Sequence, residues 1–199
     1  MDLLLIRHAE PVRIVDADGP ADPRLHERGL HQADHLAAWF ADEALDAVWS
    51  SPMRRARQTA APLAAAQGLP VLVDEELAEF DAEATSYIPI EELKAEKDER
   101  FLAMVEGRLE DFQVDPEAFK AGVVGAIERV IDGHPGKKVA VVCHGGVINA
   151  YVGHILEIPR PLWFEPGYTS INRIAASRGG VRSVVSLNEM AHLRPAPTP

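Results

Sequence analysis

The sequence predicts an α/β domain of three layers, in which helices flank both faces of a mostly parallel central sheet. Two segments, 3–6 and 138–143, are almost continuously apolar, which is typical of strands buried on both faces. Helical patterns alternate with such strand-like runs along the chain, and this order favours a parallel sheet. The chain has 199 residues, which fits one domain with a sizeable core. We expect that domain over residues 1–193 and a flexible tail over 194–199.

After the first strand, a helix is expected over residues 27–41 because apolar residues recur there at helical spacing. The apolar stripe consists of Leu30, Ala33, Leu36, Ala37 and Phe40. Residues 44–49 then form a short strand. The sequence Ser50-Ser51-Pro52 predicts the start of the next helix, with a serine N-cap and proline in the first turn.

That second helix is expected to end near Gln67, where Gly68 can act as its C-terminal stop, before a third strand at 70–73. Residues 90–112 are charged and helical in character. Asp115-Pro116 predicts another helix start. The apolar face of this helix consists of Phe119, Val123, Ile127 and Val130.

The last third of the chain contains the second clearly buried strand, 138–143, and a helix that starts at Gly145-Gly146 and ends near Leu156. Two further runs, 170–175 and 181–187, flank Arg178-Gly179-Gly180 and predict a closing hairpin. We expect this hairpin to add an antiparallel edge to the sheet.

Composition and charge exclude several classes of function. The formal net charge of −11 and the lack of a basic stripe argue against nucleic acids and anionic membranes as partners. No apolar run approaches the ~20 residues that a membrane span needs. Cys143 is the single cysteine, so neither an intramolecular disulfide nor a Cys-rich metal site is expected. A cytoplasmic location is the default expectation.

Two of the buried strands end in chemically active side chains. The first is followed by Arg7 and His8, and the second by His144 and two glycines. Ligands of open α/β sheets bind at the carboxyl ends of the strands, so both imidazoles are expected at the same edge. Arginine grips phosphate oxygens in a bidentate fashion, and histidine is suited to nucleophilic or proton-transfer roles near neutral pH. This pairing indicates a phosphate site.

A third segment places Arg54, Arg55 and Arg57 in the first turns of a helix, where the helix dipole disfavours cations. An anion bound nearby would remove that conflict. Two carboxylates, Glu79 and Asp81, follow the third strand.

Taken in order, these motifs resemble those of the histidine phosphatase superfamily, the phosphoglycerate mutase-like enzymes. The similar segments are Arg7-His8-Ala9-Glu10 (family Arg-His-Gly-Glu), Ser50 to Ala60 (family Ser-Ser-x-x-x-Arg-Ala-x-x-Thr-Ala), Leu77-Ala78-Glu79 (family Leu-x-Glu) and His144-Gly145 (family His-Gly). The matches run over almost the whole chain and together are highly specific.

The resemblance implies a phosphoglycerate mutase-like fold and a metal-independent phosphatase without cofactors. It implies that His8 attacks phosphorus to form a phosphohistidine, while Arg7, Arg55, His144 and Gly145 bind the phosphate. It further implies Glu79 as the proton donor to the leaving group, and His144 as a catalytic as well as a phosphate-binding residue. The expected substrate is a small phosphorylated metabolite.

Two departures from the family pattern affect specificity. Ala9 replaces the usual glycine beside the nucleophile, and the family's Gly-x-x-Glu-Gly sequence is absent after Glu79. The donor is therefore left open between Glu79, Asp81 and Glu83. The acidic segment at about 80–112 is expected to be a helical cap insertion over the site, and Tyr87, Phe101 and Met104 are candidates to touch the leaving group.

Other interpretations stay open at this stage. A mutase would return the phosphoryl group to its substrate, although mutases of this family are commonly longer. A non-catalytic phospho-ligand-binding module is a third reading. His31 and His35 have metal-clip spacing but no third ligand, and Cys143 fits a buried thiol better than a nucleophile. The natural substrate and a possible homodimer are not decided by the sequence.

Overall fold

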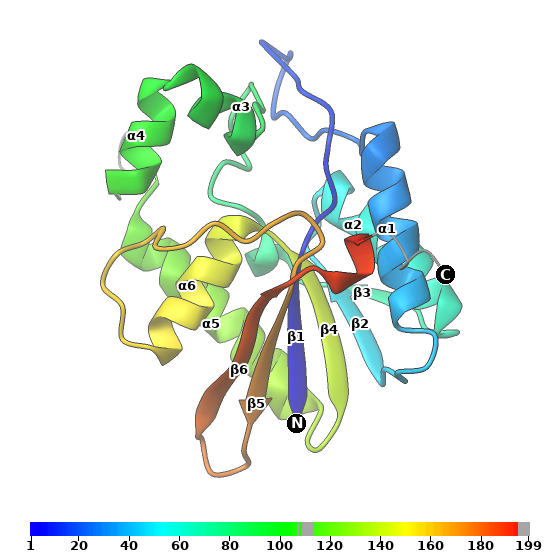
Figure 1. Ribbon diagram of the computed structural model, residues 1–199. Helices are drawn as coiled ribbons and strands as arrows, with labels where there is room; N and C mark the ends of the chain where they lie inside the picture. Colours follow the sequence, from blue (N-terminus) through cyan, green and yellow to red (C-terminus); the bar gives the residue numbers. More distant parts are fainter. Residues whose placement is uncertain (107, 109–113, 195–199) are drawn as a thin grey trace.

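The computed structural model describes residues 1–106, 108 and 114–194. Within this part of the chain, six strands form one sheet in the order β3-β2-β4-β1-β5-β6 (Figure 1). Their bounds are β1 Asp2–Arg7, β2 Ala47–Ser50, β3 Val71–Val73, β4 Lys138–Cys143, β5 Ile171–Ala176 and β6 Arg182–Glu189.

The strands β1 to β4 are mutually parallel, and the β5–β6 hairpin adds the antiparallel edge. The mostly parallel sheet and its closing hairpin are thereby confirmed. In the β1–β4 pair, Arg7 lies opposite Cys143. His8 also donates its backbone N–H to the Cys143 carbonyl at 2.9 Å, so the residues that follow the two strands start side by side.

Helices cover both faces of the sheet, which confirms the three-layer prediction. Alternate residues of β1 enter different cores: Leu4 and Ile6 pack in the cluster with α1 (Glu27–Trp39) and α2 (Arg54–Ala66). Leu3 and Leu5 pack in the other cluster with α5 (Pro116–Gly133) and α6 (Gly145–Ile155). Burial on both faces explains why these strands read as continuous apolar runs.

The helix predicted over residues 27–41 is present, but one position of its predicted apolar stripe was wrong. Leu30 is 46% exposed, whereas Gly29 and Gln32 are buried. A Cβ at Gly29 would lie 2.0 Å from the Glu10 carbonyl oxygen, and Gln32 accepts the Glu10 N–H. The buried face of α1 is therefore set by close contact with the loop after β1.

The predicted helix start at Ser50-Ser51-Pro52 was also wrong, because α2 begins at Arg54 with Met53 as its N-cap. The Ser51 hydroxyl accepts the Met53 N–H at 3.2 Å and contacts a histidine ring instead of capping the helix. The Arg54 N–H is capped by the Asp22 carboxylate, which comes from a distant loop. The end at Gln67 was confirmed, with Gly68 at φ +65°.

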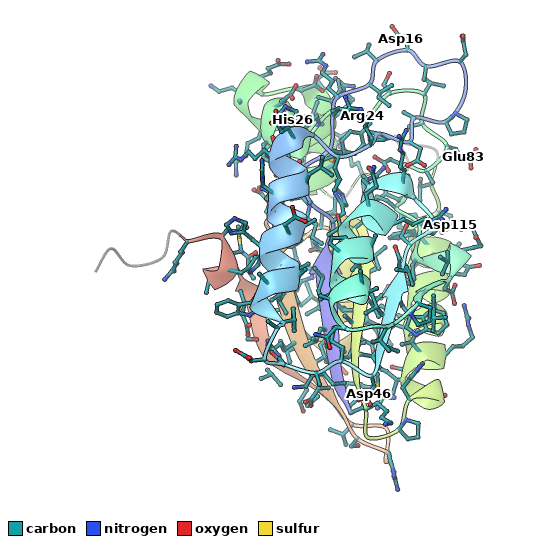
Figure 2. All side chains as sticks on the ribbon, turned by 90° about the vertical axis from the view of Figure 1, so that its right-hand side faces the viewer. Asp16, Arg24, His26, Asp46, Glu83 and Asp115 are labelled. Atoms are coloured by element: carbon teal, nitrogen blue, oxygen red, sulfur yellow. The ribbon has the colours of Figure 1, made fainter. Side chains whose placement is uncertain are left out.

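The carboxyl ends of the strands lie beneath a cap formed by α3 (Ile90–Glu96) and α4 (Glu99–Glu106) (Figure 1). Figure 2 labels Asp46, just before β2, near one end of the molecule, and Asp16 and Arg24, on the loop after β1, near the other.

Part of the expected cap, 107 and 109–113, and most of the expected tail, 195–199, lie outside the described residues. Two 3₁₀ turns, Glu75–Leu77 and Ala191–Leu193, complete the part of the fold that the structure describes. None of the helices described is long and apolar enough to cross a membrane.

Candidate active site

A pocket of about 360 Å³ opens at the carboxyl ends of the strands, beneath the cap. Its inner wall brings together residues that the sequence places far apart. Lining this end are Arg7, His8, Arg55, Glu79, Asp81, Gly145 and Gly146. The His144 ring lies directly beside His8, with 5.1 Å between the ring centroids. The predicted convergence of two imidazoles and two guanidinia is thus present in the structure.

His8 is buried in the loop that leaves β1, and its ring orientation is set by one hydrogen bond. Its Nδ1 lies 2.8 Å from the Ala9 carbonyl oxygen, which can only accept. Nδ1 must therefore carry the proton, and Nε2 of the neutral ring keeps a free lone pair. Burial, together with the charges of Arg55 and Arg7, lowers the pKa of His8 well below its usual value. The ring is accordingly neutral at physiological pH.

His144 is fully buried at the N-cap of α6 and is also uncharged. Burial and the nearby Arg55 charge lower its pKa well below the usual value. Its Nε2 lies 2.7 Å from the Ser51 hydroxyl oxygen. Cys143, which precedes it on β4, is buried among apolar side chains, and burial raises the pKa of its thiol. The interpretation of Cys143 as a buried neutral thiol is confirmed.

Arg7 points across the pocket from the end of β1. Its Nη1 donates to the Pro166 carbonyl oxygen at 2.7 Å and to the Glu91 carboxylate at 3.2 Å. Its guanidinium lies 4.0 Å from the centroid of the Tyr168 ring. Tyr168 in turn donates its hydroxyl to Glu91 at 2.8 Å. The planar group is therefore fixed on several sides.

Arg55, in the first turn of α2, is the largest side chain that is almost wholly buried, with 1% exposure. Its Nη2 donates to Asp81 at 3.3 Å, and its guanidinium stacks on the Tyr87 ring at 4.6 Å. An arginine at this helix end is disfavoured by the helix dipole, and so its burial there calls for a compensating anion.

Three buried nitrogen atoms around His8 have no hydrogen-bond partner among the described residues. They are Nε and Nη1 of Arg55 and Nδ1 of His144. Buried polar groups are rarely left unpaired, because each costs about 1–3 kcal/mol. A tetrahedral oxyanion beside His8 would supply acceptors for donors of this kind.

Glu79 is the carboxylic acid of the site. Its Oε2 accepts the Gly146 N–H at 2.8 Å, and its Oε1 accepts the Phe80 N–H at 3.1 Å. A Cβ at Gly146 would lie 2.1 Å from Oε1, so glycine is required for this approach. Burial, followed by the nearby Asp81 charge, raises the pKa of Glu79 to about 7. A carboxyl with this pKa can both donate and accept a proton near neutral pH.

The other two donor candidates are placed differently. Asp81 also lines the pocket but is paired with Arg55. Glu83 is exposed, outside the pocket lining, and sits at the outer margin of the view in Figure 2. The geometry therefore favours Glu79. His31 and His35 are exposed, and within the described residues no group of three His, Cys, Asp or Glu could hold a metal ion.

Several supporting residues were not assigned from the sequence. Thr59 accepts the Ala9 N–H at 2.9 Å and donates to the Arg55 carbonyl at 2.7 Å, which links the loop of His8 to α2. Thr169 donates its N–H to the Arg7 carbonyl at 3.0 Å, and its hydroxyl lies 2.9 Å from Nε2 of buried His192. Thr59 stands within the quoted arginine motif, whereas Thr169 follows no recognisable signal.

Comparison with known proteins agrees with this geometry. Residues 3–189 match the model of the histidine phosphatase superfamily (branch 1). Phosphoserine phosphatase 1 of Hydrogenobacter thermophilus is 34% identical over 203 residues, which cover 96% of this chain and 93% of that protein.

Solved structures show the same fold. A phosphoserine phosphatase mutant from Entamoeba histolytica, in complex with phosphoserine, has a TM-score of 0.75 at 23% identity and covers 97% of this chain and 99% of its own. A mycobacterial glucosyl-3-phosphoglycerate phosphatase in complex with VO3 has a TM-score of 0.76 at 22% identity, with coverages of 95% and 99%. Since the family model matches nearly the whole sequence, this chain belongs to the histidine phosphatase superfamily.

Proposed function

We propose that this chain is a metal-independent phosphatase that hydrolyses small phosphomonoesters through a phosphohistidine on His8. The observation that carries the proposal is the state of His8. Its ring is neutral, is oriented by the Ala9 carbonyl with Nε2 unprotonated, and lies beside two guanidinia in a pocket. This is the arrangement that a nitrogen nucleophile needs to attack an anionic phosphorus centre.

In the first step the Nε2 lone pair of His8 attacks phosphorus, a P–N bond forms and the P–O ester bond breaks. Glu79 gives its proton to the departing alkoxide, so the alcohol leaves neutral. Arg7, Arg55 and His144, with the Gly145 backbone, surround the phosphoryl oxygens, where the transition-state charge spreads.

In the second step a water molecule attacks phosphorus, Glu79 takes its proton, and the P–N bond breaks to release inorganic phosphate. The pKa of about 7 at Glu79 suits both proton transfers. Throughout, the Nδ1 proton of His8 can remain hydrogen-bonded to the Ala9 carbonyl oxygen. The guanidinia supply the positive charge that a metal ion would otherwise supply to the phosphoryl oxygens.

Two alternatives receive less support. A mutase would return the phosphoryl group to its substrate before water reaches it, but a relative named phosphatase covers almost the whole chain. A non-catalytic binding module would have no need of both a neutral nucleophile and an acid with a pKa of about 7. The presence in one pocket of residues suited to proton transfer and to phosphoryl transfer supports the interpretation as an enzyme.

The test is hydrolysis of p-nitrophenyl phosphate in the presence of EDTA. We expect the parent protein to release p-nitrophenolate and the His8→Ala variant to lose activity by several orders of magnitude. The matched control is His31→Ala, which removes an exposed histidine from α1. A 3-phosphoglycerate assay distinguishes the mutase. If His8→Ala is as fast as the parent, the nucleophile is misassigned.

Location and assembly are part of the same proposal. A single free and buried cysteine suits a reducing compartment, which supports a cytoplasmic location. A homodimer stays a prediction that light scattering of the purified protein can decide.

A further inference from the structure

The outer half of the pocket differs in chemistry from the inner half. Where the inner wall carries the phosphate-binding groups, the outer part is lined by large apolar side chains. We call this part the leaving-group chamber, and its walls are formed chiefly by Ile90, Phe101, Met104, Val105, Leu162 and Trp163. An alcohol attached to a phosphate beside His8 has to extend into this space.

One wall of the chamber is a single face of α4. Phe101, Met104 and Val105 have the i, i+3, i+4 spacing that brings side chains together on one side of a helix. Leu102, between them in sequence, points elsewhere and is 46% exposed. The apolar face of this short helix is therefore turned toward the pocket, although it has no sheet to pack against.

The polar groups of Asn149 and of the loop after α6, which also line the chamber, are already occupied. The Asn149 amide donates to the Gly145 and Phe164 carbonyls, both at 2.9 Å, and its oxygen accepts the Trp163 and Phe164 N–H groups at 2.9 and 3.0 Å. These contacts use both donors and both acceptor positions of the amide. Trp163 Nε1 donates to the Asn149 carbonyl at 3.2 Å. The hydrogen-bonding groups of this part of the wall are therefore used within the protein, and its carbon atoms are left to contact a ligand.

The charged side chains that line the chamber, Lys94, Arg160 and Glu165, are exposed, and two of them pair with each other. Both carboxylate oxygens of Glu165 accept hydrogen bonds from Lys94, and the two side chains are 51% and 55% exposed. Arg160 donates to the Val105 carbonyl. An exposed ion pair neutralises itself and is screened by water, so it contributes little to recognising a further charge.

We infer that the leaving-group chamber selects phosphate esters whose alcohol portion is apolar and about the size of a phenyl ring. The inference rests on the proposed function and adds to it a class of substrate. Apolar surface that enters the chamber gains the free energy of leaving water. An ammonium or carboxylate has to give up its hydration, whereas the charged side chains of the chamber among the described residues are already paired with each other or, like Arg160, exposed to solvent. The selectivity comes from the part of the chain that departs from the family pattern.

The experiment compares esters of primary alcohols, because their leaving groups are chemically similar. We expect kcat/KM for 2-phenylethyl phosphate to exceed that for ethyl phosphate, phosphoethanolamine and O-phosphoserine by at least about tenfold. Assays run without added metal at one pH, so that differences reflect the alcohol portion.

A pair of substitutions on α4 locates the effect. Met104→Gln keeps the length of the side chain but adds an amide inside the chamber, and it should reduce the preference for 2-phenylethyl over ethyl phosphate several-fold. Leu102→Gln makes the same kind of change on the exposed side and should leave that preference at the parental value. Thermal melting of both variants checks that they fold.

Each outcome has one meaning. If O-phosphoserine or phosphoethanolamine is hydrolysed as well as 2-phenylethyl phosphate, the inference is wrong while the proposed function stands. A preference that survives Met104→Gln unchanged also overturns the role of the α4 face. If no ester is hydrolysed at all, the proposed function has failed and the inference fails with it.

Discussion

The two ends of the pocket are built in opposite ways. At the phosphate end, buried side chains follow rigid parallel strands and are fixed by short hydrogen bonds, such as those of His8 with Ala9 and of His144 with Ser51. At the cap end, the short helices α3 and α4 are attached by ion pairs between largely exposed charges, including Arg13–Glu92 and Lys94–Glu165.

This difference separates chemistry from selectivity. Groups that move a phosphoryl group must be positioned within a fraction of an ångström, which a buried, hydrogen-bonded scaffold provides. Exposed ion pairs contribute only about 0–1 kcal/mol each, so the cap residues that form them can change at little cost. Substitutions at the phosphate end should therefore abolish turnover, whereas those at the cap should adjust which ester is used.

The largest effect is expected from removing the acid of the phosphate end. Glu79→Gln should slow the hydrolysis of alkyl phosphates by about 10²–10⁴-fold, the usual contribution of a general acid. The first-turnover release of p-nitrophenolate from p-nitrophenyl phosphate should slow much less, because p-nitrophenolate leaves readily without a proton. Asp81→Asn and Glu83→Gln are the matched controls. A larger, leaving-group-dependent loss in either of them would transfer the donor role to that residue.

Stability should depend on pH because the phosphate end contains buried neutral histidines. The pKa values of His8, His144 and His192 are lowered by burial, that of His192 to about 4, so below about pH 6.5 the unfolded chain binds protons that the folded chain does not. Glu79 acts in the opposite direction. Because its pKa in the folded protein is raised to about 7, the folded chain binds one proton there that the unfolded chain does not.

Between pH 6 and 5 the net difference approaches two protons, and the free energy of unfolding should fall by up to about 2.7 kcal/mol per pH unit. Urea denaturation in phosphate-free buffer measures the slope. The His192→Asn substitution should reduce this slope by about the contribution of one proton. A flat profile over this range would contradict the account, because it would mean that the folded and unfolded chains bind equal numbers of protons.

The pH dependence of turnover gives a smaller effect at the same end. Because the donor is active only while protonated and its pKa lies at about 7, kcat for an alkyl phosphate should fall about tenfold per pH unit well above pH 7. The Glu79→Gln variant should lack this decrease in kcat at alkaline pH. If the parent and the variant have the same alkaline limb, another group titrates.

The smallest effect concerns the contact between the two ends. Glu91 of the cap pairs with Arg7, so its carboxylate competes with a phosphate for the same guanidinium. Glu91→Gln should tighten competitive inhibition by inorganic phosphate by up to about fivefold, the equivalent of one exposed ion pair. Glu92→Gln, which removes the same charge from the pair with Arg13, is the control. Equal changes in both variants would indicate a general charge effect.

The same contrast explains how much the sequence could predict. The strands, the hairpin and the positions of Arg7, His8, Arg55 and His144 follow from apolar runs and motifs, because local patterns determine both burial and strand ends. The start of α2 could not be predicted, since the carboxylate of Asp22 caps the helix from a remote loop. The contact of the Gly146 N–H with Glu79 and the roles of Thr169 and Tyr168 likewise depend on contacts between distant segments.

The central claim is that His8 becomes covalently phosphorylated during turnover. The direct measurement is rapid mixing of enzyme with excess substrate, quenching in base, which preserves phosphohistidine, and peptide mass spectrometry. We predict a phosphoryl group on the peptide that contains His8 in the parent, accumulating further in a Glu79→Gln variant, whose intermediate is hydrolysed slowly. Turnover without any phosphorylated peptide, or with the label on another residue, would contradict the account.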